Sequence, residues 1–215
     1  MIRSKLLKNL VIASAMGMAA ASQLQAATTD EAMRQLEAIM ADDQRRQASF
    51  DAGHERIRFC GYCHGEDGNS KRDFIPNLAA QHPQYLFEQF EKFGDGRRED
   101  HVMSTLARAL SLQERIDIAV YYSQQTARPR EGADPVKAAA GQRIFQSYCF
   151  SCHGADAQGV SNMPRLAGQP AQYVETALKR FRQMDPAAST SPMVGVARGL
   201  KDEDIAAVAA YLQGR

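Results

Sequence analysis

The sequence predicts an all-α protein built from two similar small domains. Apolar residues recur at helical spacing along most of the chain, and runs of alternating β-branched residues are missing. The second half of the chain also repeats landmarks of the first half at an offset near 89 residues, which indicates two copies of one domain. The 215 residues are 44% hydrophobic and 24% charged, values that exclude a collagen, a coiled-coil rod and a disordered tail.

The first 26 residues have the organisation of a secretory signal peptide. Three basic residues, Arg3, Lys5 and Lys8, precede an uncharged, mainly apolar stretch at 10–22, and Ala26 is a suitable small residue for cleavage. The alternative is an uncleaved membrane anchor, but 13 residues are short for a bilayer core that needs roughly 20. We therefore expect the protein to be exported. The mature chain would carry 23 basic and 25 acidic residues, and this near-neutral balance predicts no nucleic-acid partner.

An N-terminal extension at 27–49 precedes the first domain. A helix is expected over 30–47, where apolar residues recur on one face. These residues are Met33, Leu36, Ile39 and Met40. Such a stripe is more typical of a packing surface than of a cofactor contact, and it has no counterpart ahead of the second domain. It is expected to pack on this chain or to dock on another one.

The two domains are expected at 50–130 and 131–215. The segment between them, 128–135, is charged and contains Pro and Gly, as linkers do. The matched landmarks occur in the same order in both domains and are Cys60 and Cys149, Pro76 and Pro164, Tyr85 and Tyr173, Met103 and Met193, and Tyr121 and Tyr211.

Two helices are predicted at matched places in each domain, from the spacing of apolar residues. Their apolar positions are Tyr85, Phe87, Phe90 and Phe93, mirrored by Tyr173, Ala177, Leu178 and Phe181, and then Ile116, Val120 and Tyr121, mirrored by Ile205, Val208, Ala209 and Leu212.

Each domain contains one Cys-x-x-Cys-His motif, which is the attachment pattern of c-type haem. In this chemistry the two thiols form thioethers with the haem vinyl groups, and the histidine becomes the proximal ligand of the iron. The motif residues are Cys60, Cys63 and His64 in the first domain and Cys149, Cys152 and His153 in the second. The sequence therefore predicts two covalently bound haem c groups.

Three other uses of the four cysteines compete with haem attachment. Disulfides are permitted in an exported protein, but they do not require a histidine after each pair. A single zinc site with four thiolates would need both pairs to converge, although each pair opens its own domain. A thioredoxin-like redox pair needs a βαβ context, which the helical pattern does not provide.

A methionine is predicted as the sixth iron ligand in both domains. Met103 lies 39 residues after His64, and Met193 lies 40 residues after His153. These matched positions favour ligation over the alternative, which is a methionine that fills a gap in the core. Two histidines without a counterpart in the second domain are expected to be solvated rather than to bind the first iron, namely His82 and His101.

Pro76 and Pro164 follow the proximal histidines by 12 and 11 residues. A carbonyl group that accepts the imidazole N–H would orient the ring and raise its basicity. The alternative is an ordinary loop proline, and the sequence does not choose between the two.

Together these motifs resemble the diheme cytochrome c4 family, which is built from two class I cytochrome c domains. The resemblance covers residues 50–215 and rests on the two haem motifs, the duplicated Pro-x-Leu-Ala-x-Gln segments and the spaced methionines. It implies two haems that face each other across the domain interface. By position, it implies proximal ligation by His64 and His153, distal ligation by Met103 and Met193, and hydrogen bonding of the proximal imidazoles by the carbonyls of Pro76 and Pro164.

The family implies a periplasmic electron carrier, not an enzyme, that takes electrons from a respiratory complex and passes them to a terminal oxidase or reductase. One alternative is the electron-accepting cytochrome subunit of a periplasmic dehydrogenase, which would differ only in having a fixed partner. Another is a diheme peroxidase-like enzyme, which would need a labile or absent distal ligand on one iron. A loose association with the membrane surface is compatible with the carrier.

Overall fold

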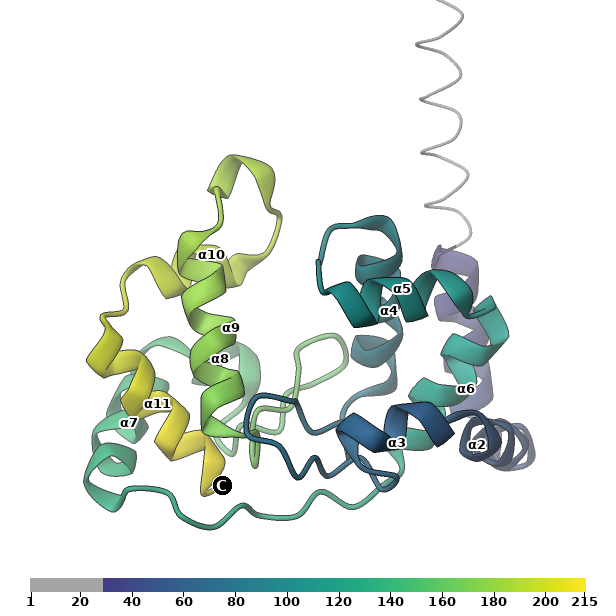
Figure 1. Ribbon diagram of the computed structural model, residues 1–215, viewed down its shortest axis with the longest axis horizontal. Coiled ribbons are helices and arrows are strands. Elements are labelled where there is room, and N and C mark those ends of the chain that lie inside the picture. The colour runs from purple at the N-terminus through teal and green to yellow at the C-terminus, as the bar shows by residue number, and fades with distance from the viewer. Residues whose placement is uncertain (1–28) are drawn as a thin grey trace, which may run out of the picture.

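The computed structural model describes residues 29–215, which form two helical domains joined by an extended linker (Figure 1). No strand occurs in this part of the chain, where the one strand-like pairing is an isolated bridge between Val160 and Met163. The all-α fold class predicted from the sequence is therefore confirmed. The signal peptide predicted at 1–26 lies outside the described residues.

The first domain contains a helix at 29–40, followed by α2 (Asp43–Arg56), α3 (Arg58–His64), α4 (Pro83–Asp95), α5 (His101–Ala109) and α6 (Leu112–Ser123). The second domain contains α7 (Pro135–Tyr148), α8 (Phe150–His153), α9 (Ala171–Gln183), the short 3-10 helix η1 (Pro186–Ala188), α10 (Pro192–Arg198) and α11 (Asp202–Gln213). The four helices predicted from the spacing of apolar residues are present as α4, α6, α9 and α11.

The helices of the two domains follow one another in the same order and have matched lengths. α4 and α9 each contain 13 residues, and α6 and α11 each contain 12. In both domains the last helix packs along the first long helix of the domain, α6 against α2 and α11 against α7. α2 therefore corresponds to α7, and the helix at 29–40 is the element that the second domain lacks.

The single helix predicted at 30–47 is wrong, because the structure has two helices there. The first ends at residue 40, and α2 begins at Asp43. Asp42 has an extended backbone, and its carboxylate accepts a hydrogen bond from the backbone N–H of Arg45 at 2.8 Å. An aspartate in this geometry caps a new helix and prevents the preceding one from continuing. The boundary predicted between residues 49 and 50 falls inside α2.

Glycine allows the first and last long helices of each domain to cross closely. A side-chain carbon at Gly53 would overlap the backbone carbonyl of Asp117 on α6, and one at Gly141 would overlap that of Ala207 on α11. The two glycines are 88 residues apart, so the same close crossing occurs at equivalent places. Backbone contact at this crossing fixes the two helices relative to each other. This helix pair is the frame from which the haem motif extends in each domain.

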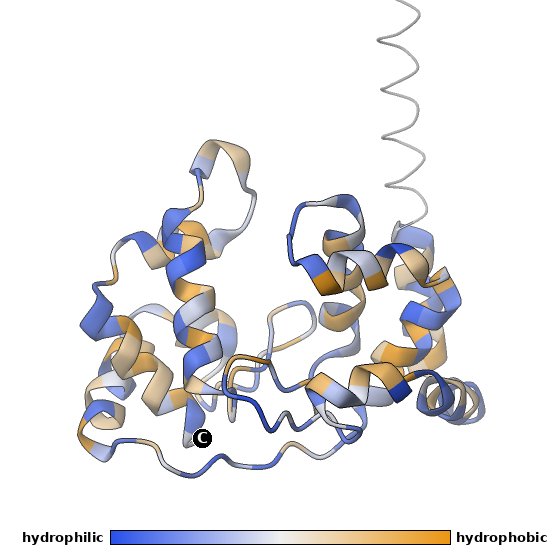
Figure 2. Cartoon of the chain, in the orientation of Figure 1, coloured by the Kyte–Doolittle hydropathy of each residue, from blue (hydrophilic) through white to orange (hydrophobic). Residues whose placement is uncertain are grey.

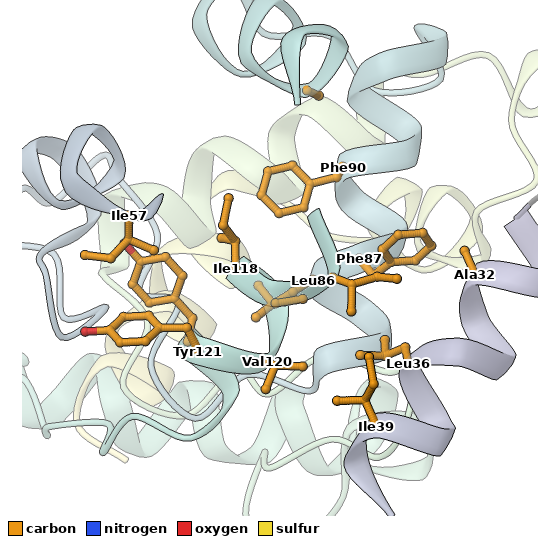
Figure 3. Packing of buried hydrophobic residues seen from close by; sticks show 14 of the residues in the cluster. Ala32, Leu36, Ile39, Ile57, Leu86, Phe87, Phe90, Ile118, Val120 and Tyr121 are labelled. Atoms are coloured by element: carbon orange, nitrogen blue, oxygen red, sulfur yellow. The ribbon is translucent and has the colours of Figure 1, made fainter. Parts of the chain in front are cut away.

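Each domain has its own hydrophobic core. In the first core, Figure 3 shows Leu36 and Ile39 of the N-terminal helix directed toward Leu86 and Phe87 of α4. Leu36 is fully buried and Ile39 is 5% exposed. The apolar stripe therefore packs on this chain, which is the first of the two uses expected for it.

Apolar residues colour the inward faces of the helices in both domains, and hydrophilic residues colour the outer faces and the linker (Figure 2). Among residues 29–215, no helix combines the length and the apolar character needed to cross a membrane. The loops that follow α3 and α8 meet between the two domains (Figure 1), and hydrogen bonds described below join them.

Candidate functional site

In the first domain the haem motif lies on α3. Helical geometry places Cys60 and Cys63 one turn apart on the same side of the helix, and it places His64 one turn beyond Cys60. The helix ends at Gly65, whose φ of +81° is a left-handed conformation that glycine adopts without strain. In the second domain α8 has the same position, and the chain turns away at Gly154 with φ +75°.

Both motif histidines are buried and oriented by a proline carbonyl. His64 Nδ1 lies 3.0 Å from the carbonyl oxygen of Pro76, and His153 Nδ1 lies 2.9 Å from that of Pro164. A carbonyl oxygen only accepts hydrogen bonds, so each Nδ1 carries a proton and donates it. Each Nε2 is then left with a free lone pair, which is the form of imidazole that binds a metal.

Burial lowers the pKa of both histidines, and the proline carbonyls act in the opposite direction. The net effect keeps His64 and His153 neutral. The same carbonyl that orients the ring makes the Nε2 atom more basic. The arrangement is therefore suited to an iron ligand and poorly suited to a proton shuttle.

The environment of the cysteines disfavours a thiolate metal site. Burial raises the pKa of Cys60, and it raises the pKa of Cys149 to about 11. Zinc binds the thiolate form, which such burial opposes. In the described part of the chain no three His, Cys, Asp or Glu side chains come together as a metal site, and all four cysteines are free of disulfides.

Both predicted distal ligands lie in the same apolar cluster as the first cysteine of their motif. Met103 is half-buried on the first turn of α5 and packs against the core that Cys60 also contacts. Met193 is half-buried on the first turn of α10 and packs against the core that Cys149 contacts. Asp100 caps α5 by accepting a hydrogen bond from Met103 N at 2.9 Å, which fixes where the methionine leaves the helix.

The two alternative histidines have other environments. His82 Nε2 lies 2.8 Å from the carbonyl oxygen of Gln158 in the other domain, so its ring takes part in an interdomain hydrogen bond. His101 is exposed at the start of α5. Neither ring is arranged like His64 and His153, whose Nδ1 atoms face a proline carbonyl.

A cluster of arginines and tyrosines at the domain interface fits the anionic side chains of a haem. Arg98 donates a hydrogen bond to the Tyr173 hydroxyl at 3.2 Å and lies over the Phe93 ring at 4.5 Å. Its Nε atom is buried without a hydrogen-bond partner among the described residues. Burial lowers the pKa of Arg180, as does the charge of Arg98, and burial with the neighbouring Tyr173 hydroxyl raises the pKa of Tyr85 to about 12.

Two nearby cations with an unused buried donor form a favourable place for an anion. Haem carries two propionate groups, so the chemistry of this cluster fits the cofactor that the cysteine motifs predict. Sequence patterns did not identify Arg98, because it lies in a charged segment of a kind that is typical of solvent-exposed loops. The repeat did pair Tyr85 with Tyr173, but without a role for either residue.

The sequence also gave no role to the repeated glutamines Gln81 and Gln169. Both are buried, with 4% and 5% exposure, and each side chain reaches across to the backbone of the other domain. The available sequence signal was the repeat itself, because the two glutamines are separated by the same number of residues as the two prolines. Two buried polar side chains at matched sites need hydrogen-bond partners.

Comparisons with known proteins agree with this geometry. The family model described as cytochrome c matches residues 138–215. A curated relative named cytochrome c4, from Thiocapsa roseopersicina, is 37% identical over 167 residues, which are 72% of this chain and 86% of the relative. The crystal structure of reduced recombinant cytochrome c4 from Pseudomonas stutzeri has a TM-score of 0.71 at 34% identity, and the match covers 76% of this chain and 97% of that one. A thiosulfate dehydrogenase electron acceptor from Thiomonas intermedia is 34% identical over 180 residues, which are 77% of this chain and 82% of the relative.

Fold, motifs and relatives define a c-type cytochrome with two covalently attached haem c groups, an electron-transfer protein and not an enzyme. More particularly, the chain belongs to the cytochrome c4 family. The resemblance inferred from the motifs is confirmed.

Proposed function

We propose that this protein is a periplasmic one-electron carrier of a respiratory chain, with each haem held between a histidine and a methionine. In the first domain Cys60 and Cys63 would form the thioethers, while His64 and Met103 would bind the iron. In the second domain the corresponding residues are Cys149 and Cys152 for attachment and His153 and Met193 for the iron.

The observation that carries this proposal is the matched pair of buried histidines. Each donates its Nδ1–H to a proline carbonyl, of Pro76 or Pro164, and each thereby presents Nε2 as a ligand. The same geometry occurs twice, once after each Cys-x-x-Cys pair. This duplication supports two equivalent proximal sites.

When bound, each haem supplies a one-electron Fe(III)/Fe(II) couple. The protein residues adjust the reduction potential of that couple, and no covalent bond forms or breaks during electron transfer. A methionine ligand would raise the reduction potential, and two protein ligands would leave no coordination position for a substrate. The burial of His64 and His153 would limit solvent rearrangement when the charge of the iron changes.

The predicted signal peptide supports a periplasmic location, and a carrier there would take electrons from a respiratory complex and deliver them to a terminal oxidase or reductase. The mature chain has a net charge of −2, which predicts weak electrostatic steering and a modest effect of salt on partner association. Association with the membrane surface would then be loose.

A second candidate is the electron acceptor of a periplasmic dehydrogenase. The observation that favours it is the relative from Thiomonas intermedia, which is named a thiosulfate dehydrogenase electron acceptor. The two roles require the same haem chemistry and differ in the donor. A peroxidase-like role is less well supported, because both methionines occupy matched positions beside their cores.

Redox titration of the purified holoprotein tests the carrier. Two one-electron waves at positive potential are expected if both irons have methionine ligands. A strongly negative wave, or turnover of peroxide, would contradict the proposal and support the peroxidase-like role.

The donor is tested by mixing the ferric protein with either a quinol-oxidising membrane complex or a thiosulfate dehydrogenase and thiosulfate. Rapid reduction by the first donor supports the respiratory role. Rapid reduction by the second alone would assign the protein to the dehydrogenase.

A further inference from the structure

We propose that Gln81 and Gln169 are positioning residues that each adjust the reduction potential of the haem in the opposite domain. The inference rests on the proposed ligation of iron by His64 and His153. It assigns a redox role to the domain interface, beyond holding the two halves together.

Gln169 holds one peptide of the first domain. Its Oε1 accepts a hydrogen bond from the backbone N–H of Asn77 at 3.0 Å, and its Nε2 donates one to the carbonyl oxygen of Asn77 at 2.9 Å. The Asn77 N–H and the Pro76 carbonyl belong to the same peptide group. That carbonyl is the one that accepts the His64 Nδ1–H at 3.0 Å.

Gln81 does the same to the second domain. Its Oε1 accepts a hydrogen bond from the backbone N–H of Arg165 at 2.8 Å, and its Nε2 donates one to the carbonyl oxygen of Arg165 at 2.9 Å. The Arg165 N–H belongs to the peptide group of Pro164, whose carbonyl accepts the His153 Nδ1–H at 2.9 Å. Each domain thus holds the peptide that orients the proximal histidine of the other.

Hydrogen bonds at the two ends of one peptide group strengthen each other. A peptide whose N–H is hydrogen-bonded becomes polarised, and its carbonyl oxygen becomes a better acceptor, by about 10–30% per bond. A stronger bond to Nδ1–H makes the imidazole a more basic ligand. A more basic ligand stabilises the ferric iron, so each glutamine is expected to lower the potential of the opposite haem.

The environment preserves this effect. Gln81, Gln169 and Asn77 are 4%, 5% and 5% exposed, so water has little access to compete for the same groups. In a dry environment the polarisation of one bond by the next is not screened as it is at a surface.

Other bonds across the interface lack this connection and therefore serve as controls. His82 Nε2 lies 2.8 Å from the carbonyl oxygen of Gln158, and neither group belongs to the peptides of Pro76 or Pro164. His82→Ala would remove this side-chain bond and keep the His82 backbone N–H, which donates to Gln81 Oε1 at 3.1 Å, so both glutamines would stay in place.

The experiment measures the midpoint potential of each haem in holoprotein carrying Gln169→Ala, Gln81→Ala or His82→Ala. In Gln169→Ala, the ratio of ferrous to ferric first haem at a fixed potential should rise about threefold, which is roughly 30 mV for a one-electron couple. In Gln81→Ala the second haem should shift in the same direction. His82→Ala should move neither haem by as much.

The ferrous, diamagnetic protein supplies a second readout. The Nδ1–H proton resonance of His64 should move upfield in Gln169→Ala, as its hydrogen bond weakens, and that of His153 should stay. Gln169→Glu retains an oxygen that accepts from Asn77 N–H, so there the His64 resonance should stay or move downfield. This variant keeps the test decisive if Gln169→Ala loosens the interface, which small-angle scattering would reveal.

Three results would overturn the inference: no shift in either glutamine variant, equal shifts of both haems in each, or a shift of the haem in the glutamine's own domain. A wild-type protein without two methionine-ligated, low-spin haems would instead contradict the proposed function. The spectrum of the wild type therefore separates the two failures.

Discussion

The two domains orient their motif histidines in the same way but surround them differently. The Nδ1 to carbonyl distances, 3.0 Å for His64 and 2.9 Å for His153, are nearly equal. The close helix crossings at Gly53 and Gly141 are also equivalent. The features that hold the motif histidines are therefore those that the duplication preserved.

The surroundings of the turn after each motif differ. In the first domain the Tyr121 hydroxyl donates a hydrogen bond to the Glu66 carbonyl at 3.0 Å, which ties α6 to that turn. The matching Tyr211 of the second domain packs its ring on Phe145, with centroids 5.4 Å apart. At the next position the first domain has Tyr122 and the second has Leu212, which has no hydroxyl to offer.

The first domain also has the additional helix at 29–40, whose Leu36 is fully buried. The comparison teaches that backbone contacts position the two motif histidines and tolerate little change, while the neighbouring side chains can diverge. Two haems in similar frames can then have different potentials and stabilities.

The largest expected effect comes from removing one of the two methionines that we propose as distal ligands. Met103→Ala and Met193→Ala should each convert one haem from a low-spin to a high-spin or water-ligated form, because alanine offers no thioether to the iron. If the two sites are equivalent, each variant should lose about half of the methionine–iron charge-transfer absorbance of the ferric protein.

Met184→Ala is the matched control for these variants. Met184 is half-buried in the second domain, and no methionine of the first domain corresponds to it. Both haems should stay low-spin in this variant. An unchanged charge-transfer band in Met103→Ala or Met193→Ala would contradict the assignment of that ligand.

The next largest effect is expected at the helix crossings. Gly53→Ala and Gly141→Ala should each lower the free energy of unfolding by about 3 kcal/mol, because the new methyl group meets a backbone carbonyl that cannot rotate away. Denaturant unfolding followed by circular dichroism measures this. Similar losses in the two variants would support equivalent frames.

Gly94→Ala controls for the change of glycine to alanine in a helix. Gly94 lies on α4, and a side-chain carbon there meets nothing within 4 Å, so stability should rise by about 0.5–1 kcal/mol. A loss below 1 kcal/mol at either crossing would mean that the helices separate easily and do not fix the frame.

Leu36→Ala should affect the first domain alone. Loss of this buried side chain is expected to lower the free energy of unfolding by about 2 kcal/mol. This is near the lower limit for a buried Leu→Ala change, because the helix precedes the domain and can shift to fill the space. Hydrogen exchange should show faster opening of α4 but not of α9.

Val136→Ala is the control for Leu36→Ala, since Val136 is 78% exposed on α7 and should change stability by less than about 0.5 kcal/mol. If α9 loses as much protection as α4 in Leu36→Ala, the two domains unfold as one unit.

Much of this fold was predictable, because apolar spacing reports directly on helices such as α4 and α11. The break between residues 40 and 43 was missed, since the apolar stripe suggested one continuous helix. Asp42 was the available signal, but an aspartate within a charged stretch is as compatible with a solvated helix face as with a cap.

The haem motifs were predictable because their residues are adjacent in sequence, whereas the interface was not. Gln81 contacts Arg165 across 84 residues, and Gln169 contacts Asn77 across 92. The repeat marked the glutamines as matched, but it carries no information on which backbone they reach. Similarly, no sequence pattern distinguishes Arg98 from the other charged residues near it, whereas the structure places its guanidinium over the Phe93 ring.

The smallest expected effect tests the turn after the motif. Tyr121→Phe removes the hydrogen bond to the Glu66 carbonyl and should cost the first domain about 1 kcal/mol. Tyr211→Phe keeps the ring contact with Phe145 and should cost less than half as much. Domain-resolved hydrogen exchange of α6 and α11 measures both. Equal losses would mean that hydroxyl bonding at this position does not distinguish the domains, and the divergence would then lie in the N-terminal helix alone.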